Sequence, residues 1–140
     1  LENYKCSRLN LSLNNIKNVE LFNNTLSNTN NKLYIKKTHE GVFLGGASHV
    51  STNTNYDQVS EGIKIDDLFN KISKCSIIHL DIEGHETQAL LGAKNIINHF
   101  KPILIIESPI NDPTVKELLI MNKYKYLKKV NDNFVLKSEI

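Results

Sequence analysis

The first half of the 140-residue chain combines one helical pattern of apolar positions with several short alternating patterns. Apolar residues spaced among polar ones predict an amphipathic helix at 2–13, which stops at Asn14-Asn15. A short helix is predicted at 66–72, because Asp66 and Asp67 provide carboxylates that favour a helix N-terminus. Alternating apolar and polar residues predict three strands, at 18–22, 33–37 and 62–65.

The second half of the chain has the stronger pattern. Four strands are predicted there, at 76–82, 102–107, 124–129 and 133–137. Helices are predicted at 86–100 and 112–122, the second opened by Asp112-Pro113. Because apolar strands alternate with helices, we predict an α/β fold with a mostly parallel sheet covered on both faces and a terminal antiparallel hairpin. No linker or repeat divides the sequence, so residues 1–140 are expected to form one domain.

Composition narrows the classes of partner. The formal net charge is only +2 and no basic stripe with interleaved aromatic residues exists, so nucleic acid is not an expected partner. No apolar run approaches the roughly 20 residues that span a bilayer, and no membrane partner is expected either. Cys6 and Cys75 have neither a disulfide-framework spacing nor a metal-ligand spacing, which indicates a reduced, cytoplasmic setting.

The residues with the clearest chemical potential follow the first buried strand of the second half. They are Asp81, Glu83, His85 and Glu86. Ligands of open α/β sheets bind beyond the carboxyl ends of parallel strands, so these side chains are expected beside a cleft. Gly84 permits a sharp turn, and the next helix begins there with its positive end toward the same cleft. We predict that Asp81 and Glu83 serve a ligand and do more than cap the helix.

The same segment also raises the question of a metal site. Four potential ligands alternate along it: His79, Asp81, Glu83 and His85. A fully extended strand would point all four side chains one way, as a metal site requires. The strand is expected to end near Ile82, however, so the last two leave its plane and no metal is predicted. Glu107 ends the next strand, where it either adds a carboxylate to the cleft or serves packing and capping.

The acidic segment belongs to a longer block that resembles a known family. The block Leu-Asp-Ile-Glu-Gly-His-Glu at 80–86 continues into Ala-Leu-Leu-Gly-Ala at 89–93 and Lys-Pro-Ile-Leu-Ile-Ile-Glu at 101–107. With these motifs the chain resembles the FkbM-type methyltransferases. The similarity is most specific in the acidic block, extends more weakly to 2–19, 45–48 and 65–68, and so covers nearly the whole chain.

The resemblance implies a Rossmann-like sheet, S-adenosylmethionine as methyl donor, and transfer to a hydroxyl oxygen of a sugar or small metabolite. By the same analogy Asp81 and Glu83 lie at the cofactor. Ser27, in a turn at 23–28, lies near its adenine. His85 and Glu86 are the implied catalytic residues, for acceptor positioning or proton removal.

The chain departs from the family pattern in one respect. It contains no glycine-rich loop that joins a buried strand to a helix, and Gly45-Gly46 does not replace one. We therefore expect the chain to be the C-terminal part of such a domain, without the first strands of the sheet, and to bind S-adenosylmethionine weakly. Two functions stay open: an O-methyltransferase, or a non-catalytic remnant of the fold that binds a partner. The uncovered edge of the strand at 76–82 would favour self-association.

Overall fold

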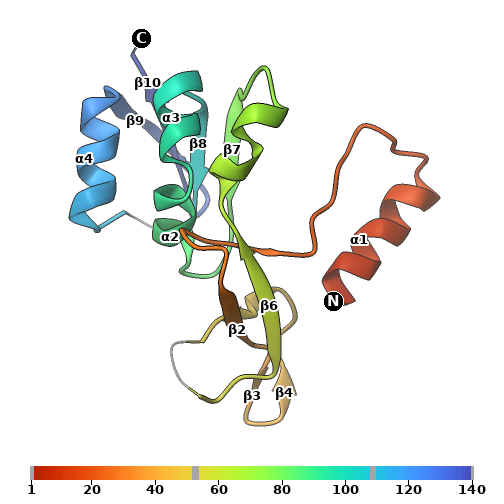
Figure 1. Cartoon of the computed structure of the whole chain (residues 1–140). Helices are drawn as coiled ribbons and strands as arrows, with labels where there is room; N and C mark the ends of the chain where they lie inside the picture. The colour runs from red at the N-terminus through yellow and green to blue at the C-terminus, as the bar shows by residue number, and fades with distance from the viewer. Residues whose placement is uncertain (1, 52–53, 108–109, 140) are drawn as a thin grey trace.

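Two separate four-stranded sheets organise the chain (Figure 1). The computed structural model describes residues 2–51, 54–107 and 110–139. The first sheet belongs to the first half of the chain and has the strand order β1 (Thr25–Leu26), β6 (Gln58–Ile63), β2 (Lys32–Lys36), β5 (His49–Val50). The second belongs to the second half and has the order β7 (Ile77–Leu80), β8 (Ile103–Ile106), β10 (Asn133–Ser138), β9 (Tyr124–Val130). The architecture is mixed α/β, as the sequence predicts.

The second sheet confirms the four strands predicted for the second half. They are β7 (Ile77–Leu80), β8 (Ile103–Ile106), β9 (Tyr124–Val130) and β10 (Asn133–Ser138). β7 and β8 run parallel, with Ile77 opposite Ile103. β10 lies antiparallel between β8 and β9, so the predicted terminal hairpin folds back into the interior of the sheet. The prediction of a mostly parallel sheet is therefore wrong, because among the described residues only one of the three strand pairs of this sheet is parallel.

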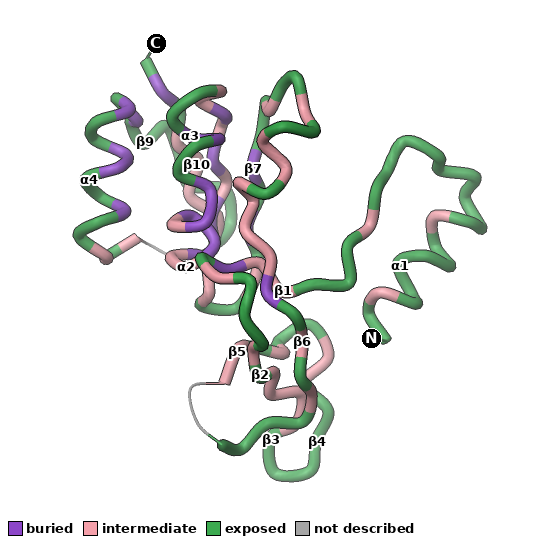
Figure 2. The backbone as a smooth tube through the Cα atoms, viewed as in Figure 1, coloured by how far each residue is buried: buried purple, intermediate pink, exposed green. Residues whose placement is uncertain are grey.

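Three helices lie on one face of this sheet (Figure 1): α2 (Glu86–Leu91), α3 (Lys94–Phe100) and α4 (Pro113–Met121). Ile78 and Leu80 point to the helices and are buried, whereas Ile77 on the other face is 55% exposed. The prediction of a sheet covered on both faces is therefore wrong for β7. Every buried apolar side chain of the described residues lies between Ile78 and Tyr124, so the core belongs to the second half (Figure 2).

The single helix predicted at 86–100 is wrong, because the structure interrupts it at Gly92-Ala93. The turn after β1 crosses Gly92 so closely that a Cβ built there would lie 2.0 Å from the carbonyl oxygen of Ser27. Only a residue without a side chain allows this approach. The interruption creates a new helix N-terminus at α3, whose backbone donors need acceptors.

Asp66 supplies those acceptors. Its carboxylate accepts hydrogen bonds of 3.0 Å from the N–H groups of Asn95 and Ile96, at the start of α3. The predicted helix at 66–72 is a 3₁₀ helix, η2 (Ile65–Lys71), and Asp67 accepts from the N–H of Lys64 at its start. The sequence predicts that both Asp66 and Asp67 cap the helix at 66–72, but only Asp67 does so, and Asp66 caps α3.

The first sheet has little apolar support. Its strands are β1 (Thr25–Leu26), β2 (Lys32–Lys36), β5 (His49–Val50) and β6 (Gln58–Ile63). A small hairpin, β3 (Thr38–His39) with β4 (Val42–Phe43), and the 3₁₀ helix η1 (Gly45–Ala47) follow β2. The strand predicted at 33–37 is confirmed as β2 with bounds shifted by one residue. The strand predicted at 62–65 overlaps only the end of β6, because Ile65 already belongs to the 3₁₀ helix η2. No apolar side chain of the described residues before Ile78 is buried, so strand pairing holds this sheet together.

The N-terminal helix lies to one side of both sheets (Figure 1), and its Glu2 side chain reaches Lys37 beside the first sheet in an ion pair of 3.8 Å. α1 (Glu2–Leu13) confirms the predicted helix, and Asn15 adopts the left-handed φ of 55° that ends it. None of its residues is buried, and no helix of the described residues is long and apolar enough to cross a membrane. The strand predicted at 18–22 is wrong. Within the described residues no strand pairs with this segment, and β2 pairs with β5 on one side and β6 on the other.

Replacing Gly92 with Ala should destabilise the fold by about 1–3 kcal/mol, because the Ser27 carbonyl has to move away from the added methyl group. Urea unfolding followed by circular dichroism measures the change. Gly46→Ala is the matched control, since a Cβ at Gly46 meets no atom within 4 Å. Equal unfolding midpoints for the two variants would contradict the tight junction.

Candidate functional site

The chain turns sharply directly after β7, and this turn arranges the predicted site residues. Glu83 and Gly84 both adopt positive φ angles, 54° and 86°. This conformation suits Gly but is unfavourable for Glu. Glu86 stabilises the turn, because its carboxylate accepts from the N–H groups of Ile82 at 3.2 Å and Gly84 at 3.4 Å. With only 3% of its surface exposed, Glu86 is a buried part of the loop.

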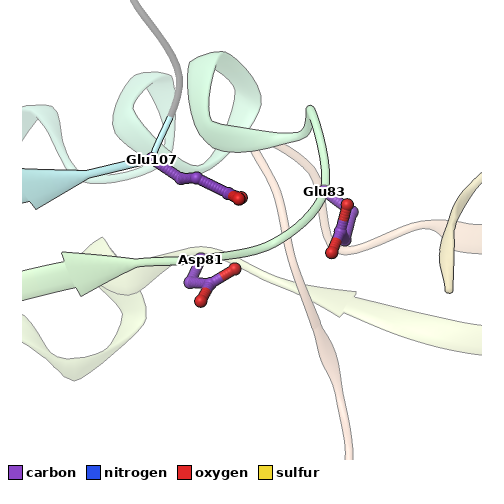
Figure 3. Close-up of side chains that lie close together, drawn as sticks. All are labelled: Asp81, Glu83 and Glu107. Atoms are coloured by element: carbon purple, nitrogen blue, oxygen red, sulfur yellow. The ribbon is translucent and has the colours of Figure 1, made fainter. Parts of the chain in front are cut away.

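Three carboxylates gather at the ends of β7 and β8 (Figure 3): Asp81, Glu83 and Glu107. One oxygen of each lies within 4.8 Å of the others. Parallel pairing brings Asp81 and Glu107 together, since the N–H of Glu107 donates to the carbonyl of Leu80. The negative charge of Asp81 is the main cause that raises the pKa of Glu107 above its ordinary value, with loss of solvation adding to it.

The spacing of this carboxylate cluster is compatible with a shared cation. Asp81 and Glu83 are both exposed, and exposed acidic groups at such distances are common in proteins without a metal. His79 and His85, which alternate with them in the sequence, are not part of the cluster. The absence of a metal therefore stays a prediction, and we assign the cluster no metal.

His85 follows the turn and contacts the junction between the two sheets. Its Nε2 lies 3.3 Å from the hydroxyl oxygen of Ser27, which in turn lies 3.4 Å from Oδ1 of Asn28. Burial lowers the pKa of His85, and the nearby carboxylate of Glu86 opposes this effect only in part. The imidazole is therefore neutral at neutral pH and available to accept a proton.

The segment at 81–85, called the acidic loop below, follows β7. A cavity of about 580 Å³ opens between this loop, the first sheet and α1. Small-ligand and cofactor sites commonly measure about 300–1,000 Å³, so its size suits such a ligand. The loop contributes Asp81, Glu83 and His85 to its wall. Polar side chains of the first half contribute the opposite wall, among them Tyr4, Lys37, Gln58 and Ser60.

The structure separates the predicted site residues into two groups. Asp81, Glu83 and His85 border the cavity, whereas Ser27 and Glu86 do not. Ser27 is 1% exposed and its hydroxyl contacts His85, which differs from the direct cofactor contact predicted for it. Glu86 holds the loop from inside, which differs from the catalytic position predicted for it.

The sequence does not predict which residues form the opposite wall of the cavity. Lys37 follows β2, lines the cavity and forms an ion pair of 3.8 Å with Glu2 of α1. The alternation of apolar residues does not show which distant strand faces the acidic loop. That placement depends on the contact between Ser27 and Gly92, which only the folded chain contains.

Comparison with known proteins decides the family. A sequence profile described as the Methyltransferase FkbM domain matches residues 1–127. The chain belongs to the FkbM methyltransferase family. No curated protein and no solved structure matches it.

In this member of the FkbM methyltransferase family the match extends from α1 into β9. It includes the acidic loop, both walls of the cavity and the junction at Gly92. The resemblance seen in the motifs at 80–107 is thereby confirmed. The family assignment covers the cavity as a whole and not only the acidic block.

Replacing Glu107 with Gln should raise the urea midpoint at neutral pH, because it removes one of three crowded like charges. A raised pKa means that the folded chain keeps a proton which the unfolded chain releases above about pH 4.5. This proton stabilises the unmodified folded chain at low pH, and the stabilisation is lost as the pH rises through the raised pKa. Below pH 4.5, where Glu107 is protonated and uncharged like Gln, the two chains should therefore have the same urea midpoint. Glu117→Gln, on the exposed side of α4, is the control. A Glu107→Gln midpoint no higher than this control at neutral pH would argue against the repulsion.

Proposed function

We propose that this FkbM methyltransferase transfers a methyl group from S-adenosylmethionine to a hydroxyl oxygen of a sugar or small metabolite. The observation that carries the proposal is the meeting of two carboxylates, Asp81 and Glu83, with the neutral imidazole of His85 on one cavity. In a methyltransferase, the carboxylates are suited to a cationic cofactor and the imidazole to the proton of the acceptor.

The sheet around the cavity supports a Rossmann-like arrangement. β7 and β8 are parallel, α2 and α3 connect them, and β10 joins them antiparallel. The carboxylates lie beyond the carboxyl ends of β7 and β8, where open α/β sheets bind their ligands.

The charges of the cavity fit the proposed cofactor. S-adenosylmethionine carries positive charge on its sulfonium and amino groups, and carboxylates stabilise such charges. Asp81 and Glu83 are the residues that would hold these groups. When bound, the cofactor supplies a methyl group that is already activated, so the protein needs mainly to align the acceptor and remove a proton.

His85 is the residue proposed to remove that proton. In this proposal the Ser27 hydroxyl donates its hydrogen to Oδ1 of Asn28, and the hydroxyl oxygen of Ser27 accepts a hydrogen bond from the Nε2–H of His85. This arrangement leaves the lone pair of Nδ1 for the hydroxyl proton of the acceptor. Because burial lowers the pKa of His85, the transfer rate should rise with pH as far as that pKa and be constant above it. Ser27 and Glu86 are positioning residues in this proposal.

An assay with methyl-labelled S-adenosylmethionine and a panel of sugars and small alcohols tests the function, with mass spectrometry detecting a methyl ether. The cofactor is added in large excess, because no glycine-rich loop is present and weak binding is expected. His85→Gln should slow transfer by about 10²–10⁴-fold. His39→Gln, an exposed change in the β3-β4 hairpin, should have no effect.

Transfer that survives in His85→Gln would exclude His85 as the base. Cofactor binding by the unmodified chain without transfer to any acceptor would instead favour the non-catalytic binding module.

Replacing Ser27 with Ala should slow transfer while the affinity for S-adenosylmethionine stays unchanged, because Ser27 orients His85 from behind the cavity wall. Parallel transfer assays and calorimetric titrations separate these two effects. If Ser27 instead contacts the adenine directly, as the sequence predicts, the Ser27→Ala variant should bind S-adenosylmethionine more weakly. Asp81→Asn is the comparison variant, since loss of its charge should weaken cofactor binding.

A further inference from the structure

A second cavity, of about 340 Å³, lies between α4 and the hairpin of β9 and β10. It is separate from the cavity at the acidic loop, because the two share no lining residue among the described part of the chain. Apart from Lys116, the described residues that line it are aliphatic or aromatic. Its volume lies within the range of sites that bind small ligands.

The second sheet forms one wall of this second cavity. Phe134 lies opposite Ile106, and Leu136 lies opposite Tyr126, so that each pair faces the same side of the sheet. Ile106 is fully buried, whereas Tyr126 is 57% exposed. The cavity therefore extends from the apolar core, at Ile106, to the solvent at the ring of Tyr126.

α4 forms the other wall. Lys116, Leu119 and Ile120 are spaced by three and four residues, so they lie on one side of the helix. Leu119 is buried, whereas Lys116 and Ile120 are exposed. α4 thus contributes apolar side chains to the cavity and one lysine to its mouth.

The charges at the mouth are positive. Within the part of the chain that the structure describes, no carboxylate forms an ion pair with Lys116. The ammonium group of Lys129 lies 5.3 Å from the centre of the Phe134 ring and pairs with Asp132 at 3.6 Å. An apolar cavity beside an unpaired ammonium group complements a molecule with a hydrocarbon body and a negative end.

We propose that the second cavity binds a small amphiphilic carboxylate, such as a medium-chain fatty acid. The hydrocarbon chain lies between the sheet and Leu119, and the carboxylate lies at Lys116. A broad partner surface would cover Ile120 and Tyr126 but would leave the space above the buried Ile106 empty. A slender chain fills that space and removes its apolar wall from water. The proposal does not depend on methyl transfer.

Calorimetric titrations of the full chain with octanoate, octanol and octylammonium separate the hydrocarbon chain from the head group. Octanoate should bind most tightly and octylammonium most weakly, because Lys116 attracts only the carboxylate. Each methylene group removed from octanoate should weaken binding up to about fourfold. Octylammonium binding as tightly as octanoate, or hexanoate binding as tightly as octanoate, would overturn the proposal.

Two exposed variants test the walls without disturbing the core. Ile120→Gln should weaken octanoate and octanol alike, by about fivefold. Its matched control is Met121→Gln, since both side chains are 74% exposed on α4 but only Ile120 lines the cavity. Equal weakening by the two variants would contradict the proposed position of the hydrocarbon chain.

Lys116→Gln should weaken octanoate by about two- to fivefold and leave octanol unchanged. Lys128→Gln is the control, because Lys128 is exposed and pairs in register with Val135, on the other face of the sheet. An unchanged affinity for octanoate in Lys116→Gln would exclude Lys116 as the partner of the carboxylate.

Nuclear magnetic resonance of the ¹⁵N-labelled chain locates the ligand. Octanoate should shift the amide signals of Leu119, Tyr126 and Phe134, and shifts confined to the acidic loop would overturn the proposal. Sedimentation velocity tests a second copy as the occupant. A dimer that Ile120→Gln dissociates, or binding to phosphatidylglycerol vesicles without binding of free octanoate, would assign the surface to another partner and overturn the proposal.

Discussion

The close packing of the Ser27 carbonyl over Gly92 is the contact on which the rest of the structure depends. It lies at the interruption between α2 and α3, next to the N-terminus of α3 that Asp66 caps. The N–H of Asp66 also donates to the carbonyl of Gly92, and the N–H of Ser27 donates to Ile63. One junction thus joins the first sheet to the core and brings Ser27 against His85.

The candidate site contains several groups in unfavourable surroundings. Glu83 has a positive φ angle, Glu107 and Asp81 repel one another, and the half-buried His85 is held neutral. Such features persist only where the surrounding structure compensates for them, and here the buried carboxylate of Glu86 holds the turn. In the proposed function a cationic cofactor would offset the repulsion among the carboxylates, so binding and local stability are linked.

The two halves of the chain are stabilised by different forces. The second half has the buried apolar core, whereas the first relies on strand pairing and on polar groups such as Asp57. Asp57 accepts from the N–H groups of Lys37 and Thr38, and these hydrogen bonds, led by that of Lys37, lower its pKa. Water competes for exposed hydrogen bonds of this kind, so each contributes little net stability. The wall of the cavity formed by the first half is therefore the one better able to adapt to a ligand.

The sequence by itself determined the elements that depend on local pattern. The strands at 76–82 and 102–107, the helix opened by Asp112-Pro113 and the terminal hairpin all agree with the structure within a few residues. In each, residues close in sequence supply the signal: a continuous apolar run, a capping carboxylate or a turn. The acidic motif at 80–86 likewise indicated the family and the end of the sheet where carboxylates gather.

The tertiary structure alone decided which distant groups meet. It interrupts the helix at Gly92, gives Asp66 to α3, leaves 18–22 without a strand partner and puts Ser27 behind His85. None of these outcomes follows from spacing, because each depends on contacts between segments that lie far apart in the sequence. Both edges of β2 are paired, one with β5 and the other with β6. At Gly92, between α2 and α3, the backbone of Ser27 lies in close contact. A local pattern records the preferences of a segment, whereas the choice among its possible partners is made by the packing of the whole chain.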